Sequence, residues 1–147
     1  MVIVCSATTT ARQRLAFART FPPAPSGRER LKRVLVVDDH AAVREAVAEE
    51  CRGLGCQVET AADGAAALEL VDCFKPDLIV LDFHMPVMNG SEFALRYRQR
   101  CQCQATLVLL TAETDIERHA RDIGADAWIS KSDPDALRPA IASLLSP

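Results

Sequence analysis

Short apolar runs alternate with helically spaced apolar positions from residue 33 to the end of the chain. The runs predict five strands, at residues 34–37, 57–60, 78–81, 106–110 and 127–130. Between them, apolar side chains recur every three or four residues, as at Val43, Val47 and Cys51, which predicts helices. Continuous Val, Leu and Ile runs are typical of strands that helices cover on both faces. The pattern therefore predicts an α/β fold: a doubly wound, five-stranded parallel sheet with helices on both faces.

Helix ends are marked by residues with special backbone preferences. Asp133 and Pro134 read as the N-cap and first residue of the last helix. Pro139 follows five residues later and lacks an amide donor, so we expect a kink or a restart there. Three glycines stand where helix C-caps are expected: Gly53, Gly55 and Gly124.

Charge and composition divide the chain near residue 31. Residues 1–31 carry five arginines, one acid and the proline-rich stretch 21–27, for a net charge of +4. Residues 32–147 carry −7. We expect 1–31 to be a flexible Arg- and Pro-containing extension, with a targeting peptide as the alternative, and 32–147 to be one folded domain. An acidic domain argues against direct nucleic-acid binding.

The apolar runs are also too short for a membrane protein, which needs about 20 residues for a spanning helix. The six cysteines include no Cys-x-x-Cys pair and no Cys/His set with zinc spacing. The start of the chain lacks the pattern of a secretory signal, so a cytoplasmic location is expected.

Polar residues follow four of the five predicted strands. Asp38 and Asp39 follow the first strand, and Asp82 follows the third. Thr111 and Lys131 follow the fourth and fifth. Carboxyl ends of parallel strands meet at one edge of a sheet, where such folds bind ligands. Three carboxylates together favour a bound cation, and oxygen ligands suit Mg²⁺. With a lysine and a hydroxyl beside them, they could accept a phosphoryl group on a carboxylate.

Four segments in order carry a family resemblance: 34–40, 77–90, 109–112 and 124–131. Together they resemble the receiver domain of bacterial two-component response regulators, which has a flavodoxin-like fold, over about residues 32–146. The resemblance implies that Asp82 is the phosphoacceptor. It implies Mg²⁺ ligation by Asp39, Asp82 and the His84 backbone carbonyl, with Asp38 acting through water. Lys131 and Thr111 would bind phosphoryl oxygens, and Trp128 would be the aromatic switch residue alongside Thr111. His84 and Glu113 occupy the positions that tune dephosphorylation.

The same resemblance implies a signalling role rather than an enzyme with turnover on other substrates. A sensor histidine kinase or a histidine phosphotransfer protein would be the partner, and phosphorylation would change contacts of the face made by the fourth helix, fifth strand and fifth helix. That face is also the candidate homodimer surface. Because the sequence stops after the fifth helix, we expect a single-domain regulator. Relay, phosphate sink and effector roles stay open, and no downstream target is indicated.

The chain departs from the family pattern after Lys131, where Ser132 replaces the common proline. The peptide bond there is expected to be trans or strained, because a cis bond before a non-proline residue costs about 3 kcal/mol. Asn89 replaces the commoner aspartate before Gly90.

Two other functions fit parts of the pattern. A metal-dependent phosphatase with an aspartyl-phosphate intermediate usually has a second acid two residues after the nucleophile, where this chain has His84. A flavin or nucleotide carrier would need a Gly-rich loop after the first strand, which is absent from the sequence. All three histidines are expected to be surface residues rather than metal ligands: His40, His84 and His119.

Overall fold

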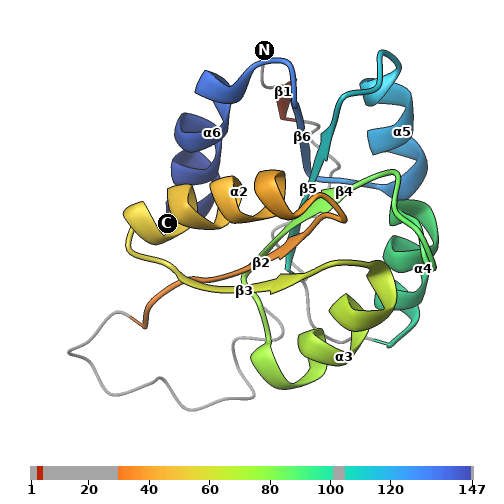
Figure 1. Cartoon of the computed structure of the whole chain (residues 1–147), viewed down its shortest axis with the longest axis horizontal. Coiled ribbons are helices and arrows are strands. Elements are labelled where there is room, and N and C mark those ends of the chain that lie inside the picture. Colours follow the sequence, from red (N-terminus) through yellow and green to blue (C-terminus); the bar gives the residue numbers. More distant parts are fainter. Residues whose placement is uncertain (1–2, 5–29, 101–104, 147) are drawn as a thin grey trace, which may run out of the picture.

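The computed structural model describes residues 3–4, 30–100 and 105–146 of the chain. Its centre is a sheet with the strand order β1-β6-β5-β4-β2-β3 (Figure 1). Five strands run parallel to one another, as predicted. These strands are β2 (Arg33–Val37), β3 (Gln57–Ala61), β4 (Leu78–Asp82), β5 (Thr106–Thr111) and β6 (Ala127–Ser130).

Side chains alternate along the strands and fill two cores, one on each face of the sheet. Leu35, Ile79 and Leu109 face one core, while their neighbours Val36 and Val80 face the other. The first core is closed by α3 (Gly64–Phe74), α4 (Gly90–Arg100) and α5 (Ile116–Ile123). The second is closed by α2 (Ala41–Gly53) and α6 (Leu137–Leu145). The doubly wound prediction is therefore confirmed, since helices cover both faces (Figure 1).

The predicted glycine caps are confirmed at one position and wrong at another. Gly124 ends α5 in the left-handed conformation, with φ of 60°. Gly53 is the last residue of α2 rather than its cap, which is Leu54. Gly55, with φ of 82°, makes the turn that leads into β3. α2 therefore ends one residue later than the sequence predicts, and Gly55 makes the turn that reverses the chain direction.

The last helix restarts ahead of Pro139. A short 3₁₀ turn, Pro134–Ala136, follows Asp133, and α6 begins at Leu137. Pro139 then lies in the first helical turn, where amide groups have no partner within the helix, so its missing donor costs little. The Lys131–Ser132 bond is trans, because the described residues contain no cis peptide.

A sixth strand was not predicted. Residues Ile3–Val4 form β1, which pairs antiparallel with β6 at the end of the sheet. Hydrophobic periodicity cannot indicate so short a strand. The rest of the expected extension lies outside the described residues, apart from residues 30 and 31. In the described part of the chain, no helix combines the length and apolar character that crossing a bilayer requires.

Candidate functional site

The carboxyl ends of the parallel strands bring four of the predicted side chains together. Asp38 follows β2, Asp82 ends β4, Thr111 ends β5, and Lys131 follows β6. Lys131 Nζ lies 2.7 Å from Asp38 Oδ2 and 3.3 Å from Asp82 Oδ1. Asp38, Asp82 and Thr111 are all buried, and the Lys131 side chain is 18% exposed. One lysine therefore joins two buried carboxylates that come from different strands.

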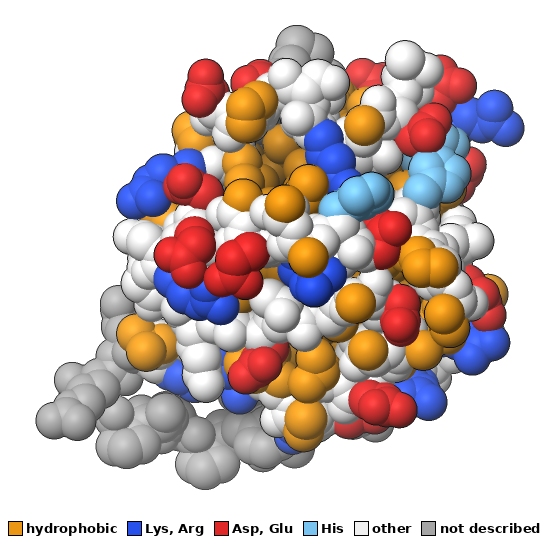
Figure 2. Space-filling model, in the orientation of Figure 1, with side chains coloured by type: hydrophobic (Ala, Val, Ile, Leu, Met, Phe, Trp, Pro, Cys, Tyr) orange, Lys and Arg blue, Asp and Glu red, His pale blue; other side chains and the backbone are white. Residues whose placement is uncertain are grey.

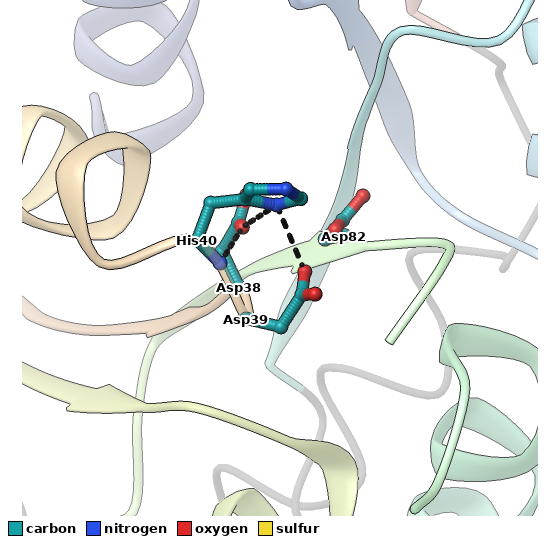
Figure 3. Close-up of side chains that lie close together, drawn as sticks. All are labelled: Asp38, Asp39, His40 and Asp82. Carbon is teal, nitrogen blue, oxygen red and sulfur yellow. Dashed lines mark hydrogen bonds and ion pairs between the residues drawn. The ribbon is translucent and has the colours of Figure 1, made fainter. Parts of the chain in front are cut away.

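The loop after β2 fixes the two neighbouring aspartates through its own backbone. Asp38 Oδ1 accepts a hydrogen bond from the His40 amide at 2.8 Å, a turn typical of aspartate. The Asp38 carbonyl accepts from Arg44 of α2, also at 2.8 Å. The Asp38 amide donates to Ala61 of β3. These bonds fix the position of the Asp38 carboxylate, and Figure 3 shows the Asp39 carboxylate pointing toward the His40 ring and Asp82.

Burial raises the pKa of Asp82 to about 6, because a desolvated carboxyl favours its neutral form. Lys131 opposes this shift, while the negative charges of Asp38 and Asp39 add to it. The positive charge of Lys131 therefore does not fully offset the effects of burial and of the two acidic neighbours on Asp82. A further cation beside it would stabilise the ionised, nucleophilic form.

The acidic group has the composition of a cation site. One ligand atom from each of Asp38, Asp39, His40 and Asp82 lies within 4.8 Å of the others. Asp39 Oδ1 is buried and accepts no hydrogen bond from any residue that the structure describes. His40 Nδ1 lies 3.1 Å from that oxygen but without hydrogen-bond geometry. A hard divalent cation matches this set of carboxylate oxygens, so the residues fit Mg²⁺.

The loop after β4 passes close to Asp82, the candidate phosphoacceptor. A Cβ at Gly90 would lie 2.7 Å from the Asp82 carbonyl oxygen, so only glycine permits this approach. The Gly90 amide donates to the Phe83 carbonyl at 2.9 Å. Val87 has a positive φ of 68° and is 83% exposed, at a tight turn closed by the Met88 amide on the Pro86 carbonyl. The loop is therefore held in a strained, compact form beside Asp82.

His84 and Glu113 meet at the rim of the site. His84 Nε2 lies 3.0 Å from Glu113 Oε1, and their side chains are 64% and 44% exposed. Thr111 Oγ1 accepts a hydrogen bond from the Glu113 amide at 3.3 Å, which links the threonine to this rim. The sequence singles out both rim positions but does not predict their contact.

Trp128, the expected switch residue, is buried in the core beneath α5. It is 6% exposed and belongs to the same core as Ile116 and Ala120. Its Nε1 is buried without a hydrogen-bond partner among the described residues. Nearby, the Phe83 ring stacks on His119 of α5, with centroids 4.1 Å apart. The loop that directly follows the candidate phosphoacceptor thus contacts α5.

Sequence reasoning missed two further contacts of the histidines. His40 is exposed at the surface, as expected, yet its ring reaches over Asp38 and Asp39 (Figure 3). Its position directly after two aspartates was the available signal. The Phe83–His119 stack joins residues far apart in the chain, and no local pattern indicates it.

An apolar hollow of about 320 Å³ opens beside Lys131, between α2 and the start of α6. Figure 2 shows hydrophobic side chains gathered in this hollow. Its lining includes Val43, Val47, Ile129, Pro134 and Leu137. A partner could therefore reach the acidic crevice across an apolar surface.

A parallel α/β sheet with three acids, a threonine and a lysine at its carboxyl edge defines a class of phosphoacceptor switch domains. Residues 34–142 match the response regulator receiver domain family, and the chain belongs to it. The response regulator MprA of Mycolicibacterium vanbaalenii is 39% identical over 113 residues, 76% of this chain and 48% of that protein. The chain thus spans about half the length of the curated relatives it matches.

Solved receiver structures agree with this assignment. The chemotaxis response regulator CheY4 of Vibrio cholerae superposes with a TM-score of 0.72 at 34% identity, covering 79% of this chain and all of that one. The response regulator TrrA of Thermotoga maritima, solved in complex with Mg²⁺-BeF, has a TM-score of 0.70 at 34% identity. It covers 78% of this chain and 100% of its own. The fold and the two-component class are therefore established together.

Proposed function

We propose that the chain accepts a phosphoryl group on Asp82 from a phosphohistidine of a sensor kinase or histidine phosphotransfer protein. The observation that carries the proposal is the Lys131 ammonium between two buried carboxylates, Asp38 and Asp82, at the carboxyl edge of the sheet. In the reaction, an Asp82 oxygen attacks phosphorus and the P–N bond of the donor breaks. The donor imidazole leaves with the electron pair, and a mixed anhydride forms on Asp82.

Each nearby side chain has a role that its position supports. Lys131 pairs with a phosphoryl oxygen once Asp82 is phosphorylated, because its ammonium already faces the attacking carboxylate. Thr111 is buried at the end of β5 and supplies a hydroxyl donor to a second oxygen. Asp38 keeps the ammonium in place through the 2.7 Å contact.

The acidic residues of the crevice fit Mg²⁺: Asp39 and Asp82 would bind it directly, Asp38 would act through water, and the His84 carbonyl would be a further ligand. When bound, the cation supplies charge neutralisation for the phosphoryl oxygens. The chain's own groups then orient the nucleophile, and the buried position of Asp82 limits the access of water.

Phosphorylation would act as a switch on protein contacts. We propose that Thr111 moves toward the phosphoryl group and that Trp128 repacks beneath α5, which shifts the population of two states of the α5–β6–α6 face. Kinase docking would use the apolar hollow between α2 and α6. The receiver unit would begin near residue 32, and the cytoplasmic location and homodimerisation through the α5–β6–α6 face are part of the same proposal.

Incubation with acetyl phosphate and Mg²⁺ tests the central step. We expect a mass increase of about 80 Da, the mass of one phosphoryl group. The adduct should be lost in base, should require Mg²⁺ and should be absent in Asp82→Asn. Asp72→Asn, which changes an exposed carboxylate on α3, is the matched control and should react normally.

Two results would overturn the proposal. One is an unchanged adduct in Asp82→Asn. The other is continuous hydrolysis of many phosphoesters without a lasting adduct, which would identify a phosphatase.

A further inference from the structure

The β6 end of the sheet carries an unexpected strand from the start of the same chain. β1 lies beside β6 in Figure 1, between α5 and α6. Val4 is paired with Ala127, and Ile3 with Trp128. The pairing is antiparallel, whereas every other neighbouring pair in this sheet is parallel. A segment outside the matched receiver region therefore occupies this edge.

The backbone geometry of β6 indicates which groups β1 satisfies. The Lys131 amide, directly after β6, donates to the Thr111 carbonyl of β5 at 2.9 Å. The backbone groups of successive residues in a strand point to opposite neighbours, so those of Ala127 and Ile129 point toward β5, and the Trp128 amide and carbonyl point toward β1. Without β1 these groups would form an open sheet edge, which is a ready template for another strand.

The β3 edge and the β6 edge of the sheet differ in the polarity of their side chains. This difference explains why another strand pairs with β6. At the β3 edge, Gln57 and Glu59 are exposed, and such polar side chains discourage pairing with another strand. In β6, Ala127, Trp128 and Ile129 are all buried, and no charged side chain lies within the strand. An apolar, uncharged edge between two helices is suited to strand addition.

We propose that the β6 edge is a strand-addition site and that residues 3–4 of the same chain fill it, masking the α5–β6–α6 face. The second half of this statement rests on the proposed function, since that face is the one assigned to phosphorylation-dependent contacts. Trp128, the switch residue of the proposed function, lies opposite Ile3, so the mask and the switch share one strand.

The mask is short and therefore reversible. Two residue pairs form few hydrogen bonds, and each contributes modestly in water. Tethering within one chain raises the effective concentration of the strand to the millimolar range, which sustains a contact too weak for separate molecules. The net charges of +4 on residues 1–31 and −7 on the remainder add a long-range attraction. A partner that binds the same edge can displace such a strand.

The backbone of residue 3 provides the test. Ile3→Pro removes the amide donor that faces Trp128 and is incompatible with antiparallel pairing at that position. Ile3→Val keeps the donor and the β-branched shape, so it is the matched control. Both changes lie away from the acidic crevice, so acetyl phosphate should label both variants as it labels the unmodified chain.

Amide hydrogen exchange of the unphosphorylated full chain measures the occupancy of the edge. We expect the Trp128 amide to exchange about tenfold faster in Ile3→Pro than in Ile3→Val, with no change at Val108 on the central strand β5. Protection should be independent of protein concentration. Equal exchange in the two variants, or protection that rises with concentration because a second copy donates the strand, would overturn the proposal.

Sedimentation of the same variants after acetyl phosphate treatment measures the masking. Ile3→Pro should dimerise at about tenfold lower protein concentration than Ile3→Val. Equal dimerisation despite faster exchange would show that β1 covers the edge without masking the face, and would refute that half of the inference. Failure to form the Asp82 adduct would instead overturn the proposed function, while the exchange result would still decide the strand contact.

Discussion

The interior of the acidic site and its rim place similar charged groups in opposite surroundings. Inside, Lys131 bridges Asp38 and Asp82, which are almost completely buried. At the rim, His84 and Glu113 lie just as close, at 3.0 Å, but both are well exposed. Coulomb energies are several times larger where water is excluded. Equal distances therefore do not imply equal importance: the interior should determine whether the chemistry occurs, and the rim how long its product lasts.

The largest effect is expected for removal of the interior cation. Lys131→Met leaves two buried carboxylates without their ammonium, so the unfolding free energy in EDTA at pH 8 should fall by about 2 kcal/mol. The rate of Asp82 phosphorylation should fall about 100-fold, since a charge that stabilises the transferred group is lost. Chemical denaturation and mass spectrometry measure the two effects. Lys75→Met changes an exposed lysine in the same way and serves as the control. Similar behaviour of the two variants would contradict the contrast between interior and rim.

The raised pKa of Asp82 predicts a pH dependence of stability. Its value rises from 3.8 to about 6 because of burial, so the folded protein binds this proton more tightly than the unfolded chain. The unfolding free energy that Asp82 contributes is then highest below pH 4, falls as the pH rises through 6, and is constant above it. Allowing for solvent screening, the fall should be about 1 to 2 kcal/mol.

Asp82→Asn removes the ionisable carboxyl group and so isolates its contribution to the pH dependence of the unfolding free energy. In EDTA, the variant should gain about 1 to 2 kcal/mol relative to the unmodified protein between pH 4 and pH 7.5. Asp72→Asn on the exposed surface of α3 should show no such gain. Urea unfolding at each pH provides the measurement. A difference between Asp82→Asn and the unmodified protein that stays constant with pH would mean that the carboxyl is not desolvated.

Mg²⁺ binding should restore part of the unfolding free energy that is lost when the buried Asp82 carboxyl group ionises. At ten times its dissociation constant, a ligand specific for the folded state adds about 1.4 kcal/mol to the unfolding free energy. Asp39→Asn removes one of the carboxylates at the crevice, and its response to Mg²⁺ should be less than half as large. Thermal unfolding with and without Mg²⁺ compares the two proteins. An equal response would exclude Asp39 as a ligand.

The parts of this molecule that sequence could predict are those that follow from the order of strands. Asp38, Asp82 and Lys131 had to meet once the strands were parallel, because their positions relative to the strand ends fix them at one edge. The contact between His84 and Glu113 depends on how two loops fold toward each other, and that geometry has no periodic signal. The antiparallel β1 was missed because a two-residue strand is set by the edge it joins rather than by its own composition.

The smallest effect, and the sharpest test of the rim, is expected for Glu113→Gln. An exposed pair contributes little to folding, so the unfolding free energy should change by less than about 0.5 kcal/mol. On the proposed function, the pair would nevertheless flank the water that attacks the Asp82 phosphoryl group. The substituted amide keeps the size of the side chain but weakens its hold on the His84 imidazole, so the adduct should lose phosphate several-fold faster. Mass spectrometry after removal of acetyl phosphate follows this decay, with Glu117→Gln on the exposed face of α5 as the control. An unchanged lifetime would mean that water reaches the phosphoryl group by a path that the pair does not cover.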